Sequence, residues 1–227
     1  MGLKLDSLYL ENFKCYENSG KIPFHNLTVF IGENDAGKST IYDALDLVLN
    51  NNSPKSEDFR DGLNTIEIKM IFSLSVEIEE LSQYIIDDKV TIIKKYNRDS
   101  ATILQILGRK FEVEDLNNYG TMKAADLIAL LERLELPPKS NQDLRKESIM
   151  NYISEESPTT VNDYIDINWS QISAYLPLFQ RYSSSDYGNP TSSVRKTLDL
   201  VYREAFYERD GNGTYSLKND FSNLQNN

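Results

Sequence analysis

The sequence of 227 residues has one cysteine and one histidine, and this scarcity excludes several kinds of site. Cys15 alone cannot form an internal disulfide or a cysteine-built zinc site, and His25 alone excludes a histidine-rich metal centre. No apolar run approaches the roughly 18 residues that suggest a membrane span, and the start of the chain lacks the apolar core of a signal peptide. We therefore expect a cytoplasmic protein without membrane contacts.

Basic side chains are also scarce, with 24 Lys and Arg against 35 Asp and Glu and a net charge of −11. A domain of this charge does not attract nucleic acid by bulk electrostatics. The one local concentration of basic residues consists of Lys94, Lys95, Arg98, Arg109 and Lys110. A solvated surface explains such a group, but these residues are the best candidates if the complete protein binds DNA through this region. We expect DNA binding only in a complete assembly.

The sequence does contain a complete phosphate-binding loop, G-x-x-x-x-G-K-S, at residues 32–39. This spacing lets successive backbone N–H groups curl around a phosphate at the positive end of a helix, and glycine removes the Cβ clashes that would prevent it. Lys38 would then contact the β- and γ-phosphates, and Ser39 would bind Mg²⁺. We predict ATP and Mg²⁺ as cofactors, and the predicted nucleotide-binding residues here are Asn34, Asp35, Ala36, Gly37, Lys38, Ser39 and Thr40.

The sequence around the loop fits this interpretation. Residues 27–31 are an apolar run that predicts a buried strand, and apolar residues recur at helical spacing after the loop, at Ile41, Ala44, Leu45, Val48 and Leu49. Residues 3–10 predict a first strand, and alternation over residues 66–72 predicts a half-covered antiparallel strand. Residues 90–96 and 102–107 predict a hairpin.

Helical periodicity begins at residue 121 and continues to Pro137-Pro138, which cannot continue a helix. A second helix is expected to begin at Ser140, with Asp143 three residues later as an acidic capping box. Further along we expect a solvated turn at 161–166, a core strand at 173–180, a loop at 183–190 and an amphipathic helix at 194–206. The predicted domains are a nucleotide-binding core with an antiparallel β lobe (1–115), a helical subdomain (116–170) and a returning segment (171–227).

A phosphate-loop ATPase also needs a strand of apolar residues that ends in Asp or Asp-Glu, which holds Mg²⁺ and polarises the attacking water. The nearest match, residues 128–132, lies inside a segment of helical period and is followed by Arg133, so we interpret it as core plus surface. No L-S-G-G-Q-like segment occurs, and the closest small-residue run, 183–186, is interpreted as a loop. The catalytic residues therefore stay unassigned.

Two stretches carry a family resemblance. Residues 8–16, Leu-Tyr-Leu-Glu-Asn-Phe-Lys-Cys-Tyr, and residues 27–40, through the phosphate loop, resemble the N-terminal opening of ABC-type ATPases of the RecF and SMC kind. The version Asn-Asp-Ala-Gly-Lys-Ser at 34–39 is most similar to the overcoming-lysogenization-defect (OLD) family of ATP-dependent nucleases. A weaker likeness covers residues 176–186. The specific part of the resemblance is residues 1–75.

This resemblance implies an α/β fold: the P-loop head portion of an ABC-type ATPase, with an antiparallel β lobe and an added helical segment. It also implies that Lys14 lies near the nucleotide and that Gln180, in the loop after a core strand, senses Mg²⁺ and the γ-phosphate. The signature motif, the acidic magnesium motif and the Toprim nuclease of such proteins are not visible in this sequence.

The function implied is that of the ATP-binding N-terminal portion of an OLD- or RecF-like ATPase that acts on DNA in phage defence or repair. The chain would depend on a missing C-terminal part or a partner for hydrolysis, would have little activity alone, and would work as a homo-oligomer or with a partner protein. An alternative is a stand-alone interaction module that ATP switches without turnover. A complete small kinase or GTPase is disfavoured because the sequence has no lid arginine cluster and no Asn-Lys-x-Asp segment.

Overall fold

The computed structural model describes residues 2–33, 36–76 and 78–181, together with residues 195, 198, 199, 202, 206–209 and 215–217. These residues divide into two units, one formed by 1–106 and 165–227 and the other by 107–164. The sequence predicted a helical subdomain over 116–170, whereas the structure places the boundaries of the second unit at Leu107 and Tyr164. Each unit is described by itself below.

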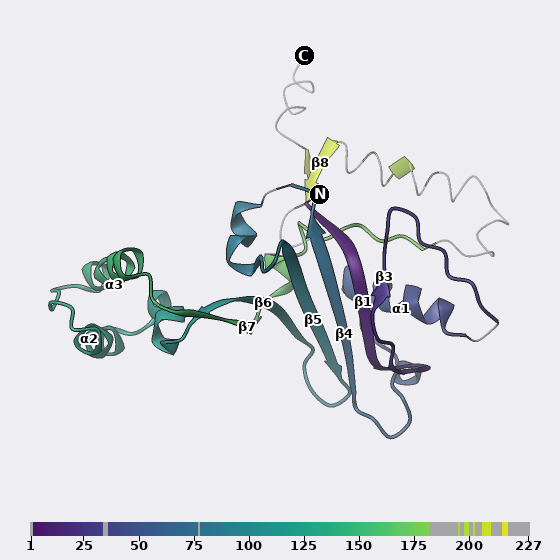
Figure 1. Cartoon of the computed structure of the whole chain (residues 1–227), viewed down its shortest axis with the longest axis horizontal. Helices are drawn as coiled ribbons and strands as arrows, with labels where there is room; N and C mark the ends of the chain where they lie inside the picture. The colour runs from purple at the N-terminus through teal and green to yellow at the C-terminus, as the bar shows by residue number, and fades with distance from the viewer. Residues whose placement is uncertain are drawn as a thin grey trace, which may run out of the picture. The chain divides into compact units, whose positions relative to one another are not determined.

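The first unit contains most of a largely antiparallel sheet, and the last two strands of that sheet include residues on both sides of the unit boundaries (Figure 1). Its strand order is β2-β1-β4-β5-β6-β7, and β3 also pairs with β1. The strands are β1 (Leu3–Phe13), β2 (Tyr16–Asn18), β3 (Ile22–Pro23), β4 (Thr65–Leu74), β5 (Lys89–Asn97), β6 (Ile103–Phe111) and β7 (Thr160–Asp166). The first strand, the strand over 66–72 and the hairpin of β5 and β6 are confirmed. Beyond this sheet, β8 (Tyr207–Arg209) pairs with β9 (Tyr215–Leu217).

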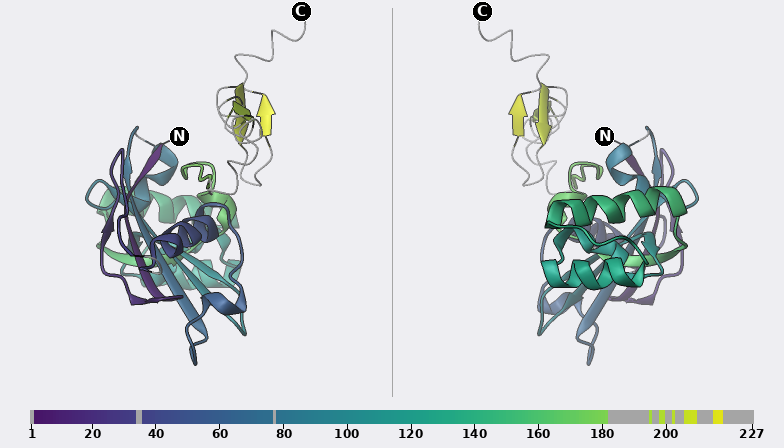
Figure 2. Two further views of the ribbon diagram at one scale, coloured as in Figure 1. Left: turned by 90° about the vertical axis from the view of Figure 1, so that its right-hand side faces the viewer. Right: turned by 90° about the vertical axis from the view of Figure 1, so that its left-hand side faces the viewer.

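One face of the sheet packs against the helix α1 (Lys38–Leu49), which directly follows the phosphate loop (Figure 2, left). The even-numbered residues of β4 from Ile66 to Phe72 are fully buried, as the alternating pattern predicts. They share one hydrophobic core with the apolar face of α1, which is the face that the helical spacing predicted. The buried residues of α1 in this core are Ile41, Ala44, Leu45, Leu47, Val48 and Leu49.

The second unit contains two helices that lie side by side, α2 (Ala124–Arg133) and α3 (Gln142–Glu156) (Figure 2, right). They have a small core of their own, formed by Leu116, Leu127, Leu130, Leu131 and Ile149. α3 begins later than the sequence predicted, because Asn141 rather than Ser140 is the N-cap and its side chain accepts a hydrogen bond from the N–H of Leu144 at 2.9 Å. Among the described residues, no helix combines the length and apolar character needed to cross a bilayer.

Two predictions of local structure in the second half of the chain were wrong. Residues 160–166 form the edge strand β7 rather than a solvated turn; most of their side chains are exposed, so the usual apolar alternation of a strand is absent. Residues 173–180 form turns and irregular backbone rather than a core strand, although Ile172 and Leu176 do enter the core. The predicted loop at 183–190 lies outside the described residues, as does most of the predicted helix at 194–206.

A buried lysine anchors the C-terminal end of α1 to the sheet. Lys94 and Tyr96 are two residues apart on β5, so their side chains lie on the same face of the sheet. Lys94 is only 3% exposed. The Tyr96 hydroxyl donates to the carbonyl of Leu47 at 2.8 Å, and the Lys94 ammonium donates to the same carbonyl at 3.4 Å and to Asn51 Oδ1 at 2.6 Å. A cation and a hydroxyl at the negative end of a helix satisfy carbonyls that the helix leaves unpaired.

Burial lowers the pKa of Lys94 from 10.5 to about 8. The folded protein therefore binds fewer protons than the unfolded chain between these values, and the free energy of unfolding should rise with pH across that window. Lys94→Met should make this rise shallower, by at most about 1.4 kcal/mol per pH unit. Urea unfolding at about pH 8 and about pH 10 measures the slope. The control Lys95→Met changes an exposed neighbour, and equal slopes in all three proteins would contradict the prediction.

Candidate nucleotide-binding site

The phosphate loop enters α1 through Gly37, which has φ 82° and ψ 5° and serves as the N-cap. No side chain caps the first turn of α1, and that turn contains no acidic residue. The N–H groups of Lys38, Ser39 and Thr40 are therefore not satisfied by a cap, and they lie at the positive end of a twelve-residue helix. This is the arrangement of donors that an anion such as phosphate requires.

Lys38 lies against the loop that precedes it. Its ammonium donates to the carbonyl of Gly32 at 2.8 Å and to the carbonyl of Glu33. Ser39 is exposed in the first turn, so its hydroxyl is accessible to a metal ion. No group of three or more His, Cys, Asp or Glu side chains suited to a metal occurs in the described part of the chain.

The remaining predicted loop residues divide into two groups. Ala36 is exposed, and Thr40 is buried beneath the first turn. Asn34 and Asp35 lie outside the described residues.

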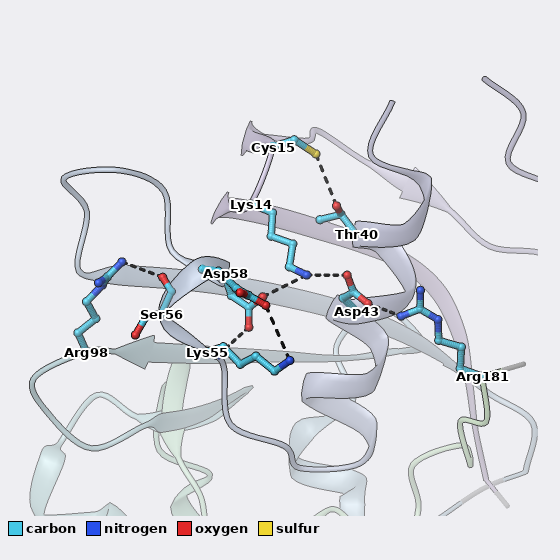
Figure 3. A network of polar contacts seen from close by, with 10 residues as sticks. Lys14, Cys15, Thr40, Asp43, Lys55, Ser56, Asp58, Arg98 and Arg181 are labelled. Carbon is cyan, nitrogen blue, oxygen red and sulfur yellow. Dashed lines mark hydrogen bonds and ion pairs between the residues drawn. The ribbon is translucent and has the colours of Figure 1, made fainter. Parts of the chain in front are cut away.

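The turn between β1 and β2 packs directly on the loop at Gly37. A Cβ atom built on Gly37 would lie 2.9 Å from the Cys15 sulfur and 2.9 Å from the Tyr16 hydroxyl. The Cys15 thiol also lies 3.6 Å from the Thr40 hydroxyl, within hydrogen-bonding range for sulfur (Figure 3). Glycine is therefore needed at position 37 both for its positive φ and for the close approach of the turn.

Gly37→Ala should destabilise the fold more than Gly62→Ala does. Both glycines have positive φ, 82° and 76°, but a Cβ on Gly62 meets nothing within 4 Å. The left-handed conformation alone costs an alanine about 1–2 kcal/mol, so Gly62→Ala should lose roughly that amount. Gly37→Ala should lose more, because the crowding at Cys15 and Tyr16 adds to it. Urea unfolding of both variants measures the difference, and equal losses would show that the turn accommodates the methyl group.

Lys14 lies in a network of charges beside α1 (Figure 3). Its ammonium is 2.7 Å from Asp43 Oδ2 on α1 and 3.1 Å from Asp58 Oδ1, the last residue of a 3₁₀ turn, η1 (Ser56–Asp58). Arg181 also forms an ion pair with Asp43. Partial burial lowers the pKa of Lys14 and raises that of Asp43, but the hydrogen bonds within the network outweigh burial. The pKa of Lys14 therefore lies above its usual value and that of Asp43 below its usual value.

Gln180 lies in the irregular segment that runs beside α1, with its side chain partly buried. Its neighbours attach the segment to the helix: the Phe179 carbonyl accepts a hydrogen bond from Asn50 Nδ2 at 3.3 Å, and Arg181 pairs with Asp43. No strand precedes Gln180, so the predicted strand-then-loop setting is wrong. The sequence analysis missed Asp43, although its spacing of four residues from Ser39 places both on one face of a helix. No sequence signal marks Arg181.

The predicted buried strand at residues 27–31 is also wrong. The segment has no strand pairing, and Leu27, Val29 and Ile31 are 81%, 67% and 91% exposed. Phe30 points the other way and packs edge-on against Phe24 and Tyr42, with ring centroids 5.8 and 6.0 Å apart. None of the described residues accepts a backbone hydrogen bond from the N–H groups of this segment. The alternation of a strand is present, but the outer apolar face and the backbone have no partner strand in the described structure.

The basic residues of the β5–β6 region do not form a free patch. Lys94 is buried, so it cannot contact DNA as the sequence analysis allowed. Lys95 pairs with Glu67 at 3.3 Å, and Lys110 pairs with Asp163 at 3.0 Å. Arg98 lies over the Phe59 ring, 4.7 Å from its centroid. Most of these charges are thus engaged within the chain.

The site has the features of a P-loop nucleotide-binding head. These are a left-handed glycine, a helix start without a side-chain cap, and a lysine and a hydroxyl in the first turn of the helix. The chain belongs to the AAA ATPase domain family, whose model matches residues 3–220. It is an ATPase domain related to the SMC and RecF proteins, of the ABC type.

Three curated proteins illustrate this relationship. The chain is 28% identical over 170 residues to chromosome condensation protein dpy-27 of Caenorhabditis elegans, covering 69% of this chain and 11% of that protein. It is 24% identical over 172 residues to structural maintenance of chromosomes protein 1 of Arabidopsis thaliana, with coverages of 63% and 14%. It is 28% identical over 185 residues to the DNA replication and repair protein RecF of Lactococcus lactis, with coverages of 80% and 43%. The chain thus spans less than half the length of each of these relatives.

A solved structure from work entitled "Structural biochemistry of ATP-driven dimerization and DNA stimulated activation of SMC ATPases" also matches. The match has 22% sequence identity and a TM-score of 0.37, and it covers 59% of this chain and 81% of the solved chain.

Proposed function

We propose that this chain binds ATP with Mg²⁺ through residues 32–40 and supplies the nucleotide-binding portion of a RecF- and SMC-like ATPase. The observation that carries this proposal is the uncapped first turn of α1, entered through a left-handed Gly37 and followed by Lys38 and an exposed Ser39. When Mg²⁺ and nucleotide are bound, Lys38 neutralises phosphate charge, Ser39 holds the metal, and the loop N–H groups orient the phosphates.

Lys38→Ala should weaken binding of Mg²⁺-ATP about tenfold or more, because it removes a hydrogen-bonded charge from the phosphates. Calorimetric titration of the wild type and the variant measures the loss. Lys95→Ala is the matched control, since Lys95 is 45% exposed on β5 and pairs with Glu67. If Lys38→Ala and Lys95→Ala bind with the affinity of the wild type, the loop is not the nucleotide site.

Hydrolysis by this portion requires further polypeptide, either a C-terminal part or a partner protein. The support is the segment 27–31, which feeds the phosphate loop and exposes Leu27, Val29 and Ile31. Exposed apolar side chains and an unpaired backbone along this segment are better satisfied by pairing with an added strand than by contact with water. The acid that polarises the attacking water would come from that added part, and two such heads would join in the working oligomer.

The complete protein is proposed to act on DNA, and the curated relatives named for chromosome condensation, chromosome maintenance and DNA repair support this. With a net charge of −11 and its basic hairpin residues largely paired, this chain alone would bind duplex DNA weakly. We assign the complete protein to the OLD group, with a nuclease elsewhere and a role in phage defence or repair, because of the sequence Asn-Asp-Ala-Gly-Lys-Ser at 34–39.

The isolated chain, saturated with ATP, should turn over far more slowly than about 1 s⁻¹, a rate within the ordinary enzyme range. The reason is that the nearest match to an apolar strand ending in an acid, residues 128–132, lies within the helix α2. Phosphate release measures the rate, and Lys38→Ala gives the background. Sustained turnover near that rate, lost in Lys38→Ala, would mean that this chain contains the catalytic acid. If the whole protein also binds ATP without hydrolysing it, ATP acts as a switch rather than as a substrate.

A further inference from the structure

Asp43 lies on α1 four residues after Ser39, and residues at this spacing occupy the same face of a helix, one turn apart. Its carboxylate contacts two cations from distant parts of the sequence. Lys14 reaches it from the β1–β2 turn at 2.7 Å, and Arg181 reaches it from the segment that follows Gln180 (Figure 3). Asp43 is therefore the point where two separate segments attach to the phosphate-loop helix.

The Lys14 contact holds a strained turn in place. Lys14 has φ 49°, and Asn12, two residues earlier in β1, has φ 57°. A positive φ is uncommon for residues other than glycine and costs a residue such as lysine about 1–2 kcal/mol. The Lys14 N–H donates to the Asp58 carbonyl at 2.8 Å, while its ammonium pairs with Asp58 and Asp43. These bonds offset the strain and press the following residue, Cys15, against Gly37 and Thr40.

The Arg181 contact sets the direction of the segment around Gln180. Asn50, the C-cap of α1, donates to the Phe179 carbonyl at 3.3 Å, and Arg181 pairs with Asp43, which lies closer to the start of the helix. The segment therefore runs along α1 from its C-terminal end toward its phosphate end. In the described structure, the hydrogen bond from Asn50 would then remain without Asp43, but Asn50 lies at the end of the helix that is far from the loop.

We propose that Asp43 is a positioning residue of the nucleotide site, which holds Lys14 and Arg181 on α1 and so directs the β1–β2 turn and the Gln180 segment toward the phosphate loop. This inference rests on the proposed function. Asp43 acts through its two partners rather than on the nucleotide itself. Its two cations and the carboxylates of Asp43 and Asp58 sum to no net charge, so the network adds no repulsion toward bound phosphates.

The test compares Asp43→Asn with Asp46→Asn, a matched control on the same helix. Asp46 accepts hydrogen bonds from Asn50 and Asn52 at 2.7 and 2.8 Å and contacts neither Lys14 nor Arg181 in the described structure. Affinity for Mg²⁺ with a non-hydrolysable ATP analogue, measured by calorimetry, should fall about tenfold in Asp43→Asn and less than about twofold in Asp46→Asn. In a Lys14→Met, Arg181→Met background, adding Asp43→Asn should cause little further loss, since its partners are already gone.

A second readout needs no nucleotide. Cys15 is the only cysteine of the chain, and its thiol rests against Gly37 and Thr40. Cys15 is exposed, so a thiol reagent can reach it in the folded protein, but its thiol contacts the Thr40 hydroxyl. Its rate of reaction with the reagent should rise about threefold or more in Asp43→Asn, because this contact is made less often once the turn loses its charged anchor. Asp46→Asn should react at the wild-type rate.

The outcomes separate the two proposals. If Lys38→Ala binds as well as the wild type, the nucleotide site is wrong, and the Cys15 rates still decide whether Asp43 holds the turn. If Lys38→Ala weakens binding but Asp43→Asn matches Asp46→Asn in affinity and in Cys15 reactivity, the role of Asp43 is overturned and the site stands. An equal loss from Asp43→Asn in the double-variant background would also overturn it, because Asp43 would then act independently of Lys14 and Arg181.

Discussion

The position of α1 on the sheet is the constraint on which the rest of this structure depends. The helix lacks a side-chain cap at its start, which costs a typical helix about 0.5–2 kcal/mol, and its N-terminal N–H groups lie at the proposed nucleotide site. Its stability must come from tertiary contacts. The apolar face buries six residues against the sheet, and the Tyr96 hydroxyl and Lys94 ammonium hold the carbonyl of Leu47 at the other end.

These contacts divide the helix into two ends with opposite demands. At its C-terminal end, the carbonyl of Leu47 is met by the ammonium of Lys94, and the almost complete burial of Lys94 lowers its pKa to about 8 because a buried site disfavours the charged form. At its N-terminal end, the donors are left available, and the β1–β2 turn, which begins with the left-handed Lys14, packs against the loop. The contacts at the C-terminal end of α1 hold the helix in place, and the N-terminal end can therefore keep a geometry that the phosphate loop alone could not maintain.

Much of the first unit could be predicted from the sequence, because its elements are local and their patterns are strong. The alternation in β4 and the helical spacing in α1 each reflect a single buried face. The strand and the helix predicted from these patterns were both confirmed. The failures occur where the decisive contact is distant in sequence. Residues 27–31 have the residue pattern of a strand, but the described structure provides no neighbouring strand for their backbone to pair with. β7 pairs at the edge of the sheet with few buried side chains, so its sequence resembles a turn.

The same distinction applies to the site. The loop residues from Gly37 to Thr40 form a contiguous motif, whose chemistry is readable from spacing alone. The pairing of Asp43 with Arg181 joins residues 138 positions apart, and no local pattern could reveal it. Lys94 illustrates the converse problem: its sequence neighbours are basic, and only the fold shows that it points into the core while Lys95 points out.

The segment at residues 27–31, unpaired in the described structure, makes this polypeptide prone to self-association in solution. An extended segment with three exposed apolar side chains is also a template for unintended pairing, either with a second copy or with any unfolded chain nearby. Self-association through this edge would be insensitive to ATP and would worsen with concentration. An assembly that joins two loaded heads would instead require nucleotide. The dependence of particle size on nucleotide therefore separates a working complex from aggregation, even when both have the same mass.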